Sequence, residues 1–355
     1  MSTLERKIHR GLKLFIALVI LTMLALLIFS DPNPEKKFSF NIINRITYAF
    51  KQMEPIYLLF CFFFWVVHIF LDSFRVTLLS QGVTGRCVSL RTSAEIILTG
   101  AFLAAVTPFQ TGGLPVQLYL LKREGVSYGK GTLIILLRAI FYALMMLIVL
   151  PFLFPFLIQQ YDSTSIKILS KYSLIVYPVI VFIIALVLIK PNIIKRFLYR
   201  LAFMGGKRRE KAVKLIHRLF KEIKEMKDGF WHFVREKKWH SLASFFLTFI
   251  AYIPYFFIAP LLLKGMGIDV VFIRIAFLQL VVILFTFFSP TPGATGVSEG
   301  VFAIMFLSIV GKGLLGVFTI LWRFFTFYLS SIAGGIITLD VLKLGEVDID
   351  DEGTE

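Results

Sequence analysis

The sequence has 355 residues, 57% of them hydrophobic and 39 of them phenylalanine, and its mean hydropathy is +0.82. Several apolar stretches exceed the length needed to cross a bilayer, so the composition excludes a water-soluble globular protein and predicts an all-α, polytopic membrane protein. The formal net charge is +16. It is concentrated between apolar segments, where excess Lys and Arg mark cytoplasmic loops, and we therefore expect no nucleic-acid partner.

The first third of the chain contains two predicted spans. Residues 14–29 form the first span, which follows a basic N-terminus and lacks a cleavage site, so we expect a cytoplasmic N-terminus. Residues 40–53 mix apolar and polar side chains in a pattern typical of an interfacial helix. Residues 55–79 form the second span, which returns to the cytoplasm. Within it Asp72 and Arg75 lie three residues apart, and we favour an ion pair near the interface over a transport role.

The next two apolar stretches are too short to span. Residues 92–106 and 114–121 fall below the roughly 20 residues that a spanning helix needs, and they are separated by residues 107–113, TPFQTGG. If the first stretch alone crossed the membrane, residues 190–238 would face outside, although they hold 16 Lys and Arg against five acidic residues. The positive-inside bias opposes that arrangement. We therefore predict a re-entrant hairpin that enters and leaves on the cytoplasmic side.

The middle of the chain continues with two spans and a basic segment. Residues 132–158 lead outward, residues 159–171 form an external loop, and residues 172–189 return. Residues 190–239 form a basic cytoplasmic segment in which apolar side chains recur at helical spacing. This pattern indicates an amphipathic helix on the inner leaflet that contacts anionic lipids. A charged helix packed on the base of the protein itself is the alternative.

The last third contains a span, a second hairpin and a final span. Residues 241–263 lead outward. Residues 270–310 form a second re-entrant hairpin, now entered from outside, whose turn is residues 289–300, SPTPGATGVSEG. Open backbone of this kind persists at membrane depth only where it is buried in protein or lines a wet cavity. Residues 314–339 form the last span, and the acidic tail, residues 345–355, is predicted to be disordered.

The two hairpins are related in sequence. Each turn begins with a hydroxyl residue and Pro, at residues 107–108 and 289–290, and each is followed by Gly-Lys-Gly 21 residues after that Pro. A single Arg then follows within an apolar span, Arg138 and Arg323. We interpret this as an inverted repeat of about residues 55–189 and 240–340, with a binding site near the bilayer midplane. Prolines that only kink helices, in a coincidental repeat, are the alternative.

The turns offer groups suited to an anionic phosphate. In each hairpin the second arm starts after the Gly-rich turn, with Thr111 and Thr295 as expected N-caps, so unpaired N–H groups point into the membrane. Arginine within a span should face protein or a cavity and can hold phosphate in a bidentate manner. The candidate substrate-binding residues are Gln110, Gly112, Gly113, Gln117, Arg138, Pro290, Pro292, Gly293, Gly296, Glu299 and Arg323.

Two alternatives remain for the charged residues. Arg138 and Arg323 can each pair with Glu299 or Glu95 and lock helices together, and Glu299 can carry a proton in a coupled cycle. The sequence contains no Gly-rich nucleotide loop and no nucleophile–base set. Its two cysteines, Cys61 and Cys87, have neither metal-ligand nor disulfide-framework spacing. We expect no catalytic residue, no cofactor and no metal.

The second turn resembles a known family. Its P-x-P-G-x-x-G-x-x-E pattern, at Pro290, Pro292, Gly293, Gly296 and Glu299, together with TPFQTGG and the later LWRFFTFY, is similar to the flippase-like membrane domain shared by lysylphosphatidylglycerol synthases and UPF0104 membrane proteins. The resemblance covers residues 1–344 and implies lipid translocation, with lysyl-phosphatidylglycerol as the cargo of bifunctional members. This sequence departs from those members because no soluble synthase domain follows, so lysyltransferase activity is not expected.

These observations lead to one functional prediction and one alternative. The protein is predicted to be a flippase or transporter in the cell membrane, with both termini cytoplasmic. Its cargo would be an anionic or aminoacylated phospholipid or a polyprenyl-phosphate-linked sugar. The alternative is a membrane-embedded subunit or anchor of an aminoacyl- or glycosyl-transferase system. Because other relatives are associated with glycosyltransferases, a glycosyltransferase or synthase is a possible partner.

Overall fold

The computed structural model describes residues 53–110, 112–157, 164–189, 227–287 and 289–352, together with six positions between residues 13 and 21. Within these ranges the protein is helical and contains no strand, which confirms the predicted all-α class. The predicted first span, the interfacial helix and most of the basic segment lie outside the described residues.

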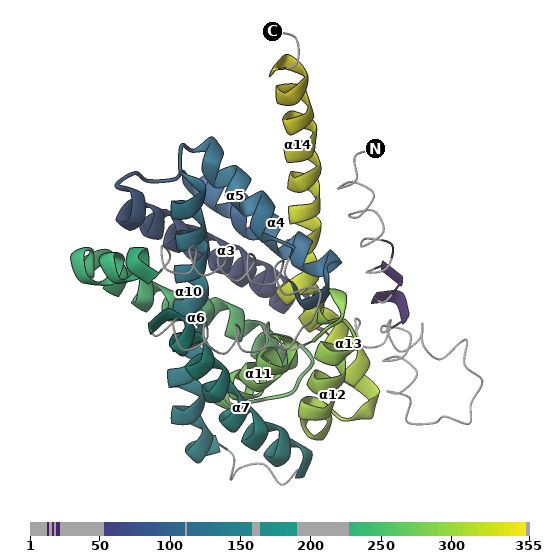
Figure 1. Cartoon of the computed structure of the whole chain (residues 1–355). Helices are drawn as coiled ribbons and strands as arrows, with labels where there is room; N and C mark the ends of the chain where they lie inside the picture. The colour runs from purple at the N-terminus through teal and green to yellow at the C-terminus, as the bar shows by residue number, and fades with distance from the viewer. Residues whose placement is uncertain are drawn as a thin grey trace, which may run out of the picture.

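The helices follow the order expected from the apolar stretches (Figure 1). They are α3 (Pro55–Thr84), α4 (Leu90–Val106), η1 (Pro108–Gln110), α5 (Leu114–Arg123), α6 (Tyr128–Leu157), α7 (Thr164–Ile189), α10 (Lys238–Gly265), α11 (Phe272–Phe287), η4 (Pro292–Ala294), α12 (Val297–Val310), α13 (Lys312–Arg323), the π-helical turn η5 (Phe324–Tyr328) and α14 (Leu329–Glu352).

Two boundaries differ from the sequence prediction. α7 begins at Thr164, so the second part of the predicted external loop, residues 159–171, is helical. α14 continues to Glu352 and includes most of the acidic tail for which disorder is predicted. Extending an existing helix adds one hydrogen bond per residue without a new nucleus, which favours continuation at both places. In Figure 1 the yellow end of α14 projects well beyond the other helices.

Five helical segments in the described part of the chain are long and apolar enough to cross a membrane: Pro55–Thr84, Tyr128–Pro155, Lys238–Gly265, Pro292–Val310 and Lys312–Val341. On α3 the large side chains of Leu59, Phe63 and Phe70 are 64%, 57% and 56% exposed. Apolar side chains exposed along one face of a helix are typical of a lipid-facing surface. The protein is therefore a multi-pass membrane protein.

The segment Pro292–Val310 combines a turn with a helix. Its continuous helix, α12, has 14 residues and is about 21 Å long at 1.5 Å per residue. This is shorter than the roughly 30 Å hydrocarbon core. The length suits the arm of a re-entrant hairpin, and that placement in the membrane stays a prediction.

The helices α4 and α5 lie antiparallel. The side-chain amide of Gln117 on α5 donates to the carbonyl oxygen of Ile96 on α4 at 3.1 Å. Near the turn, a Cβ at Gly113 would lie 3.1 Å from the Cα of Gly100. At the other end the hydroxyl of Thr92 donates to the carboxylate of Glu124, just beyond α5. The start of α4 and the end of α5 therefore lie together, at the end of the hairpin away from its turn.

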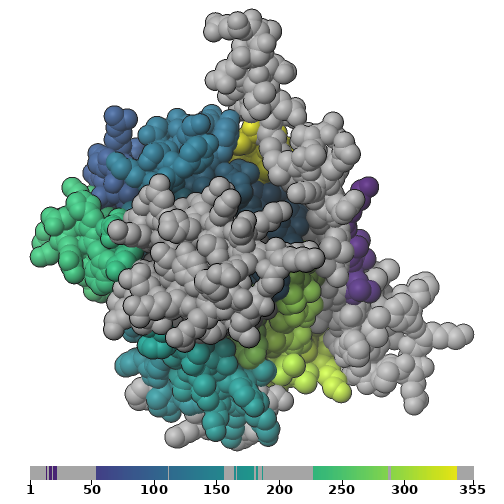
Figure 2. Space-filling view, viewed as in Figure 1, coloured from purple at the N-terminus to yellow at the C-terminus, as the bar shows by residue number. Residues whose placement is uncertain are grey.

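Close packing at glycine joins α14 to this pair. A Cβ at Gly334 would overlap the carbonyl group of Leu98 on α4, and α4 and α14 pack along one another. Small residues at such a crossing let helix backbones approach closely, which is how membrane helices gain contact without a hydrophobic drive between them. In the other half, Figure 2 shows α6 and α7 (teal) beside α12 and α13 (yellow-green) at the lower edge, and α7 contacts α12.

The two irregular turns contact each other, with η4 buried and η1 on the more exposed side. η1 packs against η4, and the side-chain amide of Gln110 donates to the carbonyl oxygen of Thr286 at the end of α11, 3.4 Å away. Two interrupted segments, 176 residues apart at this contact, thus form one structural unit. The inverted-repeat relation between the two halves stays a prediction.

Candidate functional site

The second turn has a backbone that glycine makes accessible. Gly293 and Ala294 take left-handed conformations, with φ of 61° and 55°, and Gly296 has φ of 91°. Pro290 is exposed ahead of the turn and Pro292 is buried at its start.

The N-cap of α12 differs from the prediction. Gly296, not Thr295, is the N-cap, and the Thr295 hydroxyl instead donates to the carbonyl oxygen of Pro292 at 3.0 Å. A threonine hydroxyl readily makes such local backbone hydrogen bonds, and here it closes the turn. The other expected N-cap, Thr111, lies outside the described residues.

Glu299 satisfies this helix start and pairs with Arg323. Its Oε2 accepts from the backbone N–H of Gly296 at 2.7 Å, and its Oε1 accepts from Nε of Arg323 at 2.9 Å. Arg323 Nη2 also donates to the carbonyl oxygen of Gly293 at 2.8 Å. The two side chains are only 2% and 4% exposed. Glu299 therefore occupies the place at the helix N-terminus that we expect an anionic ligand to take, and the predicted pairing of Arg323 is present.

A π-helical turn begins directly after Arg323. η5 widens the helix, and the guanidinium lies 4.3 Å from the ring centre of Phe327 and 5.6 Å from that of Tyr328. Such π turns are frequent at functional positions, and aromatic faces attract a guanidinium. The aromatic residues in LWRFFTFY thus help to hold Arg323 against the second turn.

The first turn repeats the backbone of the second. Phe109 and Gln110 take left-handed conformations with φ of 53° and 56°, the same pattern as Gly293 and Ala294. Non-glycine residues are uncommon in this region. The same strained pattern in both turns indicates that the surrounding structure fixes it.

The shared conformation corrects the sequence register of the repeat. Residues 107–112, TPFQTG, correspond to residues 291–296, TPGATG, because the left-handed pair follows the Pro of each run. The predicted match of residues 107–108 to residues 289–290 is wrong by two residues. The equal spacing to Gly-Lys-Gly is not a guide to the turn, because loop and helix lengths between the two points can differ.

The glycines of the first turn contact protein groups. The backbone N–H of Gly112 donates to the hydroxyl of Thr107 at 2.9 Å, and Gly113 packs on Gly100. The absence of a Cβ therefore lets α5 begin close to α4. The Gly112 N–H has this protein partner, and the close approach of phosphate to Gly112 stays a prediction.

Gln110 and Gln117, the other predicted binding residues of this hairpin, also donate to backbone carbonyl oxygens, those of Thr286 and Ile96. Gln117 is 7% exposed. Its side chain crosses Gly100, where a Cβ would overlap the amide. Both glutamines therefore join elements of the fold in this structure.

Arg138 belongs to a second charged cluster, on α3 and α6. Arg138 Nη2 lies 2.5 Å from Asp72 Oδ2, and Arg75 Nη2 lies 2.6 Å from Asp72 Oδ1. Asp72 and Arg75 are each 1% exposed, whereas Arg138 is 24% exposed. The predicted Asp72–Arg75 pair is present but buried in the protein. The two carboxylate oxygens of Asp72 pair with different arginines.

Glu95 is not the counter-charge of Arg138. It pairs with Arg91, 3.0 Å away, and the Arg91 side chain is 90% exposed. The helical spacing i, i+4 favours this local pair. The sequence contains a signal for the correct partner of Arg138. Asp72 and Glu299 are both carboxylates within apolar segments, and Glu299 lies nearer to Arg323 along the chain, which leaves Asp72 for Arg138.

The Asp72 cluster has more positive than negative charge. Within the described residues, Asp72 is the one acid paired with either arginine. Nε and Nη1 of Arg75 and Nε of Arg138 are buried without a hydrogen-bond partner. Buried charged donors are costly when left unpaired. This cluster is therefore the part of the described structure that best fits an anion.

Neutral aromatic groups surround the cluster. Nδ1 of His68 lies 2.6 Å from the carbonyl oxygen of Ala251, and since a carbonyl only accepts, this nitrogen donates. The rings of Tyr142 and Tyr252 lie 4.6 Å apart, and both tyrosines lie in the neighbourhood of Arg75 and Arg138. These groups add hydrogen-bonding capacity without a compensating negative charge.

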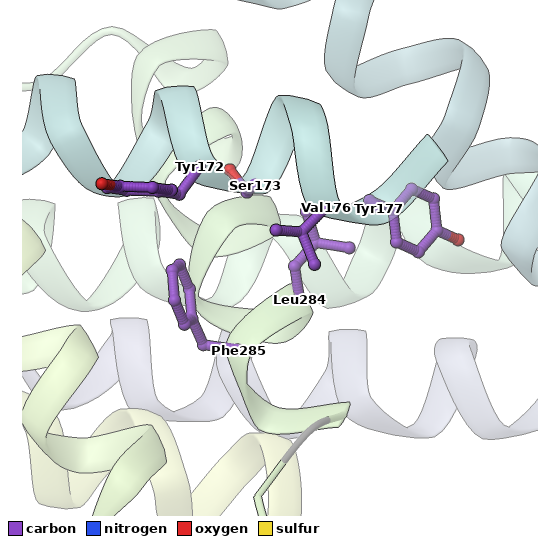
Figure 3. Close-up of a pocket in the computed structure, with 6 residues that line it drawn as sticks. All are labelled: Tyr172, Ser173, Val176, Tyr177, Leu284 and Phe285. Atoms are coloured by element: carbon purple, nitrogen blue, oxygen red, sulfur yellow. The ribbon is translucent and has the colours of Figure 1, made fainter. Parts of the chain in front are cut away.

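A separate cleft between α7 and α11 is apolar. It has a cavity volume of about 50 Å³ and is lined by Tyr172, Ser173, Val176, Tyr177, Leu284 and Phe285. Figure 3 shows Tyr172 and Val176 facing Phe285 and Leu284 across it. None of these lining residues is charged, and the Ser173 hydroxyl already donates to the carbonyl oxygen of Ser170. The cleft therefore offers no charged group to hold a headgroup. The described residues also contain no group of three His, Cys, Asp or Glu placed to hold a metal.

Comparison with known proteins identifies relatives along most of the chain. The family model of the lysylphosphatidylglycerol synthase TM region matches residues 12–334. A UPF0104 membrane protein of Archaeoglobus fulgidus is 27% identical over 278 residues, which cover 77% of this chain and 81% of that protein. No solved structure matches the chain.

Proposed function

Since the chain belongs to the family of the lysylphosphatidylglycerol synthase TM region, we propose that it moves a lipid with an anionic headgroup between the leaflets of the cell membrane. The cargo is an anionic or aminoacylated phospholipid or a polyprenyl-phosphate-linked sugar. The family's name refers to the membrane region of lysylphosphatidylglycerol synthase, and the proposal for this chain concerns a membrane-embedded step.

The observation that carries the proposal is the Asp72–Arg75–Arg138 cluster within apolar helices. An ionised side chain inside a membrane span costs at least about 2.5 to 3.5 kcal/mol. Two arginines that share one carboxylate leave part of this cost unbalanced. Intramembrane charges of this kind typically mark a substrate pathway, and the negative headgroup of a lipid would complete the balance.

The contact between η1 and η4 supports movement of one half of the protein against the other. Interrupted helices that meet inside a transporter fold commonly border the substrate site, and alternating access proceeds by movement of one part against another. Here η1 packs against η4, and the Gln110 amide also donates to the Thr286 carbonyl at the end of α11. A displacement at this contact would change which leaflet reaches the cluster.

The test is reconstitution of the full chain in liposomes with fluorescent lipids in both leaflets. Dithionite added outside bleaches outer-leaflet dye, so a protein that moves lipid increases the bleached fraction above that of empty liposomes. We expect movement of at least one anionic lipid. No movement of any anionic, aminoacylated or polyprenyl-linked lipid above the empty control would refute the proposal.

Crosslinking tests the role of the turns in the same assay. In a Cys87→Ser background, Gln110→Cys with Thr286→Cys and a short bifunctional thiol reagent would join η1 to the end of α11. Lipid movement should stop in the crosslinked protein. The single Gln110→Cys variant, treated with the same reagent, is the matched control and should retain it. Equal rates in both proteins would show that the turns need not separate.

A further inference from the structure

We propose that the Asp72–Arg75–Arg138 cluster selects a headgroup phosphate with a single negative charge, a phosphodiester, and that Arg138 makes the contact. The inference rests on the proposed function and adds the charge class of the ligand and the residue that binds it. A phosphate monoester or diphosphate, which carries more charge, is then a poorer ligand.

The charge count supports this class. Asp72 contributes one negative charge, and Arg75 and Arg138 contribute one positive charge each, so the cluster carries a net charge of about +1 at neutral pH. His68 donates one proton to the Ala251 carbonyl and is counted as neutral. Because uncompensated charge is expensive at low dielectric, a singly charged ligand balances the cluster, whereas a doubly charged ligand reverses its sign.

Exposure separates the roles of the two arginines. Arg138 is 24% exposed, whereas Arg75 and Asp72 are 1% exposed. A ligand can therefore reach the Arg138 side chain, while Arg75 acts on the ligand through its positive charge. Asp72 Oδ2 occupies one edge of Arg138 through Nη2, and a guanidinium has further N–H donors for a phosphate oxygen.

The depth of the cluster suits a headgroup in transit. Arg138 lies ten residues after the start of α6 and Asp72 lies twelve residues before the end of α3. At 1.5 Å per residue these positions are about 15 Å and 18 Å from the helix ends. Half of a bilayer's hydrocarbon core is about 15 Å thick. Both helices have 30 residues, about 45 Å, and so extend beyond the core. The cluster lies in the middle third of each helix, a depth that a headgroup reaches when it crosses.

The buried Glu299–Arg323 pair does not compete for this ligand. Arg323 is balanced by Glu299, and both side chains are almost completely buried. Arg323 also donates to the Gly293 carbonyl. With no net charge and little exposure, this pair has less to gain from a phosphate.

Binding of short-chain lipids tests the inference without requiring transport. The full chain in an uncharged maltoside detergent is titrated calorimetrically with four probes: dihexanoyl phosphatidylglycerol, dihexanoyl phosphatidic acid, dihexanoylglycerol and inorganic phosphate. We expect the phosphodiester lipid to bind most tightly and the phosphate-free lipid to bind weakest. Inorganic phosphate binding as tightly as phosphatidylglycerol would show that the ligand is the free ion and not the lipid.

Two double variants with the same net charge separate contact from field. Asp72→Asn with Arg75→Gln leaves the single charge on Arg138 and should retain phosphatidylglycerol binding within about threefold. Asp72→Asn with Arg138→Gln leaves it on Arg75 and should weaken binding about 10- to 100-fold, the range for loss of a hydrogen bond to a charged group. Equal affinities in the two variants would overturn the role of Arg138.

Single variants test the charge rule. Asp72→Asn raises the cluster charge to about +2 and should shift the preference toward phosphatidic acid, while Arg138→Lys keeps the charge but loses the bidentate fork and should weaken phosphatidylglycerol binding about tenfold. Arg91→Gln, on the exposed pair, is the control and should change neither. An unchanged preference in Asp72→Asn would refute the charge rule, and the Lys variant provides the test if loss of charge prevents folding.

The outcomes also separate this inference from the proposed function. Binding that depends on Arg138, in a protein that moves no lipid in liposomes, would refute the proposed function and leave the site standing. Lipid movement combined with undiminished phosphatidylglycerol binding in Arg138→Gln would refute the site and leave the proposed function standing.

Discussion

Replacement of Arg323 by Met tests whether the Glu299 pair holds the second turn in place. Met fills a similar volume without charge, so Glu299 would remain buried at 2% exposure with its Gly296 N–H partner. Loss of one partner of a buried pair typically costs about 3 to 5 kcal/mol. Because one N–H bond to Glu299 remains, we expect the lower end, about 3 kcal/mol, which is roughly a hundredfold change in the unfolding equilibrium.

The assay is unfolding of the purified protein in mixed micelles of increasing dodecyl sulfate content. Tryptophan fluorescence reports the transition. Trp322 contributes to its change because its ring is 2% exposed and its Nε1 donates to Oε1 of Gln279 at 3.1 Å in the folded protein. Arg91→Met is the matched control. The N–O distance of the Arg91–Glu95 pair, 3.0 Å, is close to that of the Arg323–Glu299 pair, 2.9 Å. Because Arg91 is 90% exposed, loss of this ion pair should cost no more than about 1 kcal/mol.

A double-mutant cycle separates the pair from its surroundings. Glu299→Gln keeps an oxygen for the Gly296 N–H and removes the charge, so the double variant with Arg323→Met should be more stable than the sum of the single losses by about 1 to 3 kcal/mol. If Arg323→Met costs as little as Arg91→Met, or if the two changes add, the pair does not hold the turn and the reasoning from burial is wrong.

Two further predictions concern the backbone and the topology. Gly296→Ala should destabilise the protein by about 1 to 3 kcal/mol because Gly296 has φ of 91°. Gly300→Ala, within α12 and facing open space, should be neutral or stabilise the protein by up to about 1 kcal/mol. The same dodecyl sulfate titration measures both variants, and equal effects would contradict the strain argument. Impermeant maleimide should label the exposed Cys87 only from the cytoplasmic side and cysteines at Lys264 or Lys312, in a Cys87→Ser background, only from outside; labelling of Cys87 and Lys264→Cys from one side would contradict the predicted topology.

The sequence alone predicts most of the helices because their lengths and apolar content are set by the bilayer. The arms of the first hairpin, for example, are predicted as residues 92–106 and 114–121 and are observed as α4 and α5, longer by two residues at the start and two at the end. The start of α4 differs because its N-cap is Ser89, whose hydroxyl accepts from the backbone N–H of Thr92. Capping of this kind depends on a local competition that hydropathy does not report.

The site was less predictable, and the reason is packing. Asp72 and Arg138 are 66 residues apart in the sequence, and only the packing of α3 against α6 brings them together. The Glu299–Arg323 pair, 24 residues apart, follows from the shorter connection between α12 and α13. The roles of Gly112 and Gly113 were also hidden, because a glycine that admits a neighbouring helix and a glycine that admits a ligand have the same sequence signal.

The two arginine clusters differ in charge balance, and in the proposed function this difference lets one fold hold a turn rigid and still offer a site to a ligand. Arg323 is balanced by Glu299, buried, and fixed to the Gly293 carbonyl, so movement there would expose two charges to hydrocarbon. Arg138 shares its acid with Arg75 and remains partly exposed. If the proposed function holds, a passing anion would stabilise the Asp72–Arg75–Arg138 cluster and have little effect on the Glu299–Arg323 pair. Because a ligand shifts an equilibrium only by its differential affinity for two states, any headgroup-driven change of conformation in this protein should originate at Arg138, on α6, and reach the turns through the helices that pack against it.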